Sequence, residues 1–77
     1  MRRSEFWYAV SAEFGQAYGQ IISDDLVIAQ LGDISASEAL RRGIPPRTVW
    51  EALCRAAEVP ENRWHGVGLP EPKRNDA

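Results

Sequence analysis

The apolar positions in the first twenty residues recur at steps of three and four, which is the period of one helical face. These positions are Phe6, Val10, Phe14, Ala17 and Ile21. The pattern predicts a helix that starts near residue 5, with Ser4 as its N-cap. Because Gly15 and Gly19 each weaken a helix interior, we expect a break near Gly15 and therefore two helices.

A second helical stretch is predicted through "QAYGQIISDDLVIAQLG", with Gly32 as its C-terminal stop. Its inward-facing positions are predicted to be Tyr18, Ile21, Ile22, Leu26, Ala29 and Leu31. Ser23, Asp24 and Asp25 precede an apolar run, which favours a cap and first-turn acids over a pair of catalytic carboxylates.

Two further helices are marked by their ends. In "ISASE", Ser35 and Glu38 have the spacing of a capping box, and Gly43 ends the short helix that follows. Pro46 suits the first turn of the last helix, which we expect to close at Val59 before Pro60. Its apolar stripe is Val49, Trp50, Leu53, Cys54 and Ala57.

These elements predict an all-α fold, a single compact orthogonal bundle of four or five short helices. Seventy-seven residues are enough for one core. The helical domain should cover residues 1–65, with a helix-turn-helix-like unit at residues 35–58 and a flexible C-terminal tail at 66–77. The expected core is Phe6, Val10, Phe14, Tyr18, Ile22, Leu26, Leu31, Leu40, Ile44, Val49, Trp50, Leu53 and Ala57.

Composition and charge describe an ordinary globular protein. Apolar residues make up 44%, charged residues 26%, and the net charge is −2. Basic residues gather after residue 40, but their excess is small for a dedicated nucleic-acid binder. The lone Cys54 cannot form an internal disulfide, and no apolar run is long enough to cross a bilayer, so we expect a cytoplasmic protein.

The residues offer little catalytic chemistry. Cys54 and His65 supply at most two metal ligands, Cys54 falls on an apolar stripe, and His65 has no evident acid or nucleophile beside it. No phosphate-binding glycine loop, nucleophile elbow or metal motif is present. We therefore expect no enzymatic activity, no cofactor and no bound metal.

The arginines around Gly43 raise the question of nucleic-acid binding. Arg41 and Arg42 could contact phosphates, and Arg47 and Thr48 could reach base edges from the start of the next helix. The alternative is that these arginines lie on a solvated face and bind no nucleic acid. Cations are favoured at a helix C-terminus by the helix dipole, and Glu51 can form an ion pair with Arg47. On the first helix, Trp7 and Tyr8 cannot both join the core, so an exposed aromatic could bind a protein or merely cover the core.

The segments "SEFW", "FGQAY", "EALRRGIPPRTVWEALC" and "VPENRWHG" resemble a family of small actinobacterial proteins of unknown function. Genes of that family often lie near those of the recombinase RecA and its regulator RecX. The resemblance implies a compact helical fold, an actinobacterial cytoplasmic protein and a link to DNA repair or its regulation. It implies no activity or binding residues. Pro45 departs from the family, whose members tend to have an aspartate there.

The function predicted from these observations is a non-enzymatic accessory module that binds another macromolecule, and we expect that macromolecule to be a protein. The candidate binding residues are Arg41, Arg42, Arg47, Thr48 and Trp7. The alternative is a weak DNA- or RNA-binding protein that uses the helix-turn-helix-like unit. Neither hypothesis involves a membrane.

Overall fold

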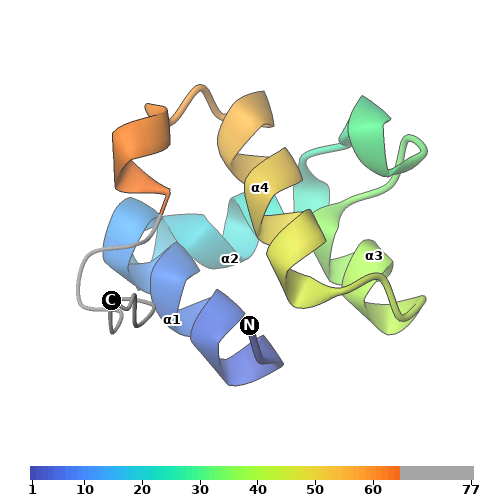
Figure 1. Ribbon diagram of the computed structural model, residues 1–77, viewed down its shortest axis with the longest axis horizontal. Coiled ribbons are helices and arrows are strands. Elements are labelled where there is room, and N and C mark those ends of the chain that lie inside the picture. The colour runs from blue at the N-terminus through green and yellow to red at the C-terminus, as the bar shows by residue number, and fades with distance from the viewer. Residues whose placement is uncertain (65–77) are drawn as a thin grey trace, which may run out of the picture.

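The computed structural model describes residues 1–64, which form a helical bundle with no strand in that part of the chain (Figure 1). The helices are α1 (Arg3–Phe14), α2 (Gln16–Asp25), α3 (Ala36–Arg41) and α4 (Pro46–Ala56). Two short 3-10 helices, η1 (Ala29–Leu31) and η2 (Glu61–Arg63), complete it. The predicted all-α fold is confirmed. The predicted tail at 66–77, the boundary at 65 and His65 lie outside the described residues.

The break between the first two helices falls where the sequence predicts it. Gly15 separates α1 from α2 with a φ of 86°, a value that residues with a side chain rarely adopt. The start of α1 differs from the prediction, since the helix begins at Arg3 and contains Ser4. The Glu5 carboxylate accepts a hydrogen bond from the Arg2 backbone N–H at 2.8 Å, so an acid in the first turn satisfies this amide without Ser4.

The predicted second helix is wrong in its length, because α2 ends at Asp25 and the chain then becomes extended. Ile28 forms an isolated antiparallel bridge with Ile34, donating its N–H to the Ile34 carbonyl at 3.0 Å. Gly32 does act as a stop, in the left-handed conformation, but it closes η1. The bridge buries Ile28 at 2% exposure, an anchor that the helical pattern missed.

The shorter α2 also changes the role of its acidic end. Asp24 and Asp25 lie in the last turn of α2, so the predicted cap and first-turn roles are wrong. Ser23 is fully buried and starts no helix. Three positions predicted to face inward, Tyr18, Ile21 and Ala29, are exposed.

The unit formed by α3 and α4 follows the predicted turn signals. Ser35 Oγ accepts a hydrogen bond from the Glu38 backbone N–H at 3.2 Å, which is one half of the expected capping box. The other half is replaced, because the Glu38 carboxylate binds arginines in the last turn of α3. Gly43 has a φ of 89°, and the N–H of Ile44 donates to the Ala39 carbonyl, which completes a Schellman C-cap.

The end of α4 repeats this motif without a glycine. The helix stops at Ala56 rather than at Val59. Val59 N–H donates to the Cys54 carbonyl at 2.9 Å and Glu58 N–H to the Arg55 carbonyl at 3.1 Å, which is the Schellman pattern. Glu58 therefore adopts a φ of 62°, in the left-handed region.

The core lies where α4 packs on α1 and α3 (Figure 1). Phe6 is fully buried and its ring meets Trp50 edge to face, with centroids 6.3 Å apart. The predicted core residues that are buried are Phe6, Val10, Ile22, Leu31, Leu40, Val49, Trp50 and Leu53. Phe14, Leu26, Ile44 and Ala57 are half-buried against them, and the prediction for Tyr18 is wrong, since it is 58% exposed. Cys54 is buried as expected.

Candidate functional site

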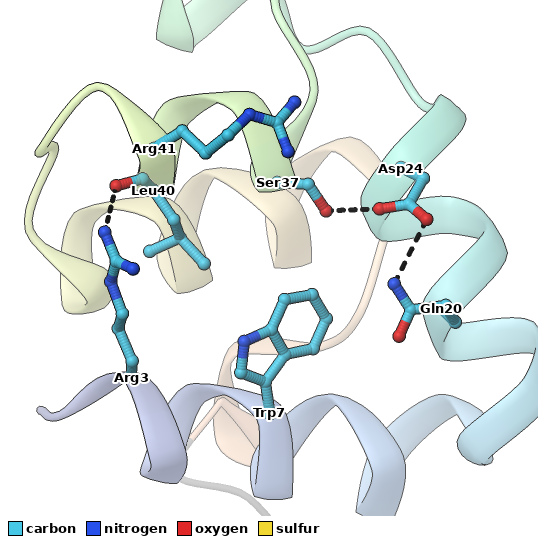
Figure 2. A pocket seen from close by; sticks show the side chains of 7 residues that line it. All are labelled: Arg3, Trp7, Gln20, Asp24, Ser37, Leu40 and Arg41. Atoms are coloured by element: carbon cyan, nitrogen blue, oxygen red, sulfur yellow. Dashed lines mark hydrogen bonds between the residues drawn. The ribbon is translucent and has the colours of Figure 1, made fainter.

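A pocket of about 230 Å³ opens between α1, α2 and α3 (Figure 2). The side chains that line it come from three helices: Arg3, Trp7, Gln20, Asp24, Ser37, Leu40 and Arg41. It includes two of the binding residues predicted from the sequence, Trp7 and Arg41.

Trp7 forms the α1 wall of the pocket. Its ring packs edge to face against Phe6, with centroids 5.0 Å apart and planes at 83°. The side chain remains half-buried, and Figure 2 shows the indole pointing from α1 into the pocket. Trp7 therefore belongs both to the rim of the core and to the surface. Tyr8, its neighbour, is 53% exposed and does not line the pocket.

Asp24 lies on the opposite side and is held by two neutral donors. Ser37 Oγ donates to Oδ1 at 2.5 Å, and Gln20 Nε2 donates to Oδ2 at 3.1 Å. The hydrogen bond from Ser37, followed by that from Gln20, holds the pKa of the Asp24 carboxyl below its usual range. Asp24 is therefore ionised at neutral pH. The same contact with Ser37 fastens the end of α2 to the first turn of α3.

Arg3 closes the pocket between α1 and α3. Its guanidinium donates to the backbone carbonyl of Leu40 at 2.5 Å, across 37 residues of sequence. That carbonyl lies in the last turn of α3 and also accepts the Gly43 N–H at 3.0 Å, so Arg3 adds a second donor at a helix end where a cation is favoured. Figure 2 shows the Arg3 side chain reaching from α1 towards α3 beside Leu40.

Glu38 pairs with the two arginines at the end of α3. Arg41 binds one carboxylate oxygen through Nε at 3.1 Å and Nη2 at 2.7 Å, and Arg42 Nε binds the other oxygen at 3.0 Å. These bonds, that of Arg41 first, hold the pKa of the Glu38 carboxyl below its usual range. Both guanidinium groups stay exposed, at 68% and 60%.

The other predicted binding residues lie outside the pocket. Arg47 and Thr48 are exposed in the first turn of α4, and Arg47 pairs with Glu51 at 3.7 Å. Arg42 extends from the end of α3 and does not line the recess either. Of the five predicted binding residues, Arg41 and Trp7 thus line the same pocket. Arg42, Arg47 and Thr48 are exposed outside it.

Four polar residues of the pocket were not among the predicted binding residues: Arg3, Gln20, Asp24 and Ser37. The spacing of Gln20 and Asp24 by one helical turn is a signal that could have joined these two. Nothing in the sequence indicates that Arg3 reaches Leu40 or that Ser37 reaches Asp24, because these contacts depend on how the helices cross.

Cys54 offers no second reactive site. Burial, followed by the nearby carboxylates of Glu13 and Glu51, raises the pKa of the Cys54 thiol to about 12, so this thiol is a poor nucleophile. Within residues 1–64, no three His, Cys, Asp or Glu side chains are grouped so that they could hold a metal ion. None of the helices described is long and apolar enough to cross a membrane.

Comparison with known proteins gives one match. The model of a family described as "Protein of unknown function (DUF3046)" matches residues 1–62. The chain belongs to this family. The DUF3046 match spans all four helices and every residue that lines the pocket. Comparisons with curated proteins and with solved structures gave no match. The resemblance to a family of unknown function is thus confirmed.

Proposed function

We propose that this DUF3046 protein is a non-enzymatic accessory module that binds another protein through the pocket between α1, α2 and α3. The observation that carries the proposal is the meeting of Trp7 and Arg41 in one recess, although 34 positions separate them in the chain. Tryptophan and arginine are the residue types most enriched at binding hot spots. A half-buried indole can be covered by a partner without a large rearrangement of the core.

The size and chemistry of the pocket favour a protein partner over a small substrate. About 230 Å³ is below the range of about 300–1,000 Å³ that is usual for small-molecule sites. It is enough for one or two side chains from a partner. The pocket does bring the Ser37 hydroxyl to the Asp24 carboxylate, but Asp24, ionised and doubly hydrogen-bonded with a lowered pKa, is a weak base for it.

The nucleic-acid alternative meets an electrostatic obstacle. Within the helix-turn-helix-like unit at residues 35–58, Arg41 and Arg42 pair with Glu38, and Arg47 pairs with Glu51. A phosphate would have to displace these carboxylates or approach them closely. Such binding would be weak and would fall steeply with salt concentration.

The family resemblance suggests where to look for the partner. Genes near those of RecA and RecX suggest that the partner belongs to DNA repair or its regulation in an actinobacterial cytoplasm. This part of the proposal rests on the resemblance alone.

The test is affinity capture from the native cytoplasm followed by direct binding of the purified partner. Four baits are compared: the unmodified chain, Trp7→Ala, Arg41→Glu, and Tyr8→Ala as the matched control for an exposed aromatic outside the pocket. Arg41 is 68% exposed, so its replacement leaves the core intact even if Trp7→Ala weakens the fold. We expect one protein to be lost with both pocket variants and retained with Tyr8→Ala.

Two outcomes would contradict the proposal. If the same proteins are retained by every bait, the pocket is not the binding surface. If binding requires DNA or RNA, weakens steeply between low and moderate salt and is lost with Arg47→Glu, the protein is the nucleic-acid binder of the alternative.

A further inference from the structure

The pocket contains two charged groups that have no ion-pair partner within residues 1–64. Arg3 donates to a neutral carbonyl, and Asp24 accepts from a neutral hydroxyl and a neutral amide. Arg41 differs from them, because it pairs with Glu38, a carboxylate that it shares with Arg42. One cation and one anion at the same recess thus have no salt bridge, although each is held in place by hydrogen bonds and the charge of Arg41 also acts on Asp24.

The two charges lie on different sides of the indole. In Figure 2, Arg3 projects from α1 beside the end of α3, Asp24 lies on α2, and the ring of Trp7 stands between them. Arg3 and Asp24 form no salt bridge with each other. The pocket is therefore bipolar, with an aromatic wall between a positive end and a negative end.

We infer that the pocket binds a partner segment that carries one basic and one acidic side chain; this inference rests on the proposed function. The basic side chain, lysine or arginine, lies along Trp7 and pairs with Asp24. The acidic side chain pairs with Arg3. A cation near an indole gains from the ring quadrupole as well as from the carboxylate. A purely acidic segment would bring its charges towards Asp24, and a purely basic segment would bring its charges towards Arg3.

The hydrogen bonds around each charge support a binding role. Ser37 and Gln20 fix both oxygens of Asp24, and the Leu40 carbonyl fixes the guanidinium of Arg3. Side chains held in this way lose little conformational freedom when a partner binds, so more of the interaction is retained as affinity.

The experiment measures binding of short capped peptides of equal length by NMR of the tryptophan indole N–H groups. One peptide carries Glu and Lys three residues apart, a second has Gln in place of Lys, a third has Gln in place of Glu, and a fourth carries Gln at both positions. Trp50 and Trp64 provide internal controls, since neither lines the pocket and Trp50 is only 2% exposed. We expect the mixed peptide to shift the Trp7 signal and to bind about five- to tenfold more tightly than the peptide without Lys.

Variants of the chain assign each charge. Asp24→Asn keeps an oxygen that can accept from Ser37 and removes the charge, and Asp25→Asn is the matched control one position away. Asp24→Asn should abolish the preference for Lys while leaving the preference for Glu, and Arg3→Gln should do the reverse, with Arg2→Gln as its control. Both control variants should bind all four peptides as the unmodified chain does.

The inference is overturned if the Glu-only peptide binds as well as the mixed one, if a short oligonucleotide shifts Trp7 in place of the peptides, or if no peptide shifts Trp7 at millimolar concentration. If no peptide shifts Trp7 but the capture experiment finds a protein that is lost with Arg41→Glu, the bipolar assignment is refuted and the proposed function stands. Failure of the capture experiment, with every bait retaining the same proteins, would refute the proposed function itself.

Discussion

The contact between α1 and α2 at Gly19 provides a sharp test of the fold. A Cβ atom on Gly19 would lie 2.6 Å from Cγ1 of Val10 and 3.3 Å from its carbonyl oxygen. Val10 is 1% exposed, so its side chain has no free space into which it can move. We therefore predict that Gly19→Ala destabilises the protein, although alanine favours helices more than glycine does.

The magnitude is the balance of two terms. Overpacking a core costs about 1–3 kcal/mol, and replacing glycine by alanine inside a helix gains up to about 1 kcal/mol. The net loss in the free energy of unfolding should be about 1–2 kcal/mol. For a domain of this size it corresponds to a fall in Tm of roughly 5–15 °C.

The assay is urea denaturation followed by circular dichroism, with Ser11→Ala as a control for helix propensity at an exposed position of α1. A double-mutant cycle isolates the contact. In the background of Val10→Ala, the clash with Cγ1 is absent, so adding Gly19→Ala should be neutral or stabilising. A Gly19→Ala variant as stable as the unmodified chain would refute the close approach of the two helices.

Three further predictions concern α4 and its end. Trp50→Ala should cost about 3 kcal/mol or more, because it empties the contact with Phe6 and removes the N–H that binds the Trp64 carbonyl; a normal melting curve would contradict the core assignment. Glu58→Gly should raise the free energy of unfolding by up to about 1 kcal/mol in urea denaturation, since it relieves a φ of 62°, whereas Asp33→Gly should gain less because aspartate tolerates that region better. The pKa of the Cys54 thiol is about 12 in the folded state and 9.0 for a free thiol, so the unfolded chain loses this proton first as the pH rises. The free energy of unfolding should therefore fall between pH 9 and 12. Cys54→Ala, measured by the same urea denaturation, should make that fall smaller.

The sequence predicts best what local chemistry determines. Gly15 and Gly43 end their helices because no other residue adopts their φ values easily, and Pro46 starts α4 because its own φ is already helical. Each of these signals acts within one turn of chain. The sequence also predicts the buried face of α4 correctly, because apolar and polar positions alternate with the helical period along the helix.

The errors occur where a tertiary contact overrides the local pattern. The helical spacing from Tyr18 to Leu31 continues without interruption in the sequence, but the bridge between Ile28 and Ile34 pulls the chain out of the helix after Asp25. Ile28 is buried at that bridge, whereas Tyr18 is exposed on α2 itself. A window confined to one segment contains no information about Ile34.

The candidate site shows the same division. Trp7 and Arg41 stood out by residue type, and aromatic and cationic residues are the usual choices for a binding surface. Their meeting in one pocket depends on Arg3 reaching the Leu40 carbonyl and on Ser37 reaching Asp24, which are contacts across 37 and 13 residues. Residue type could therefore suggest the candidates, but only the crossing of three helices selects among them.

The charges of the pocket and the apolar core are built from different side chains. The charged groups of the pocket, Arg3, Asp24 and Arg41, all lie on the surface, whereas the core is built from apolar side chains beneath them. Changing one of these charges removes no buried apolar area, but Arg3 and Asp24 also form the hydrogen bonds that join α1 and α2 to α3, so replacing either one should weaken the fold as well as the pocket. Trp7 is the exception, since it touches Phe6, which in turn touches Trp50. The charges can therefore set the choice of partner, while Trp7 connects the pocket to the core.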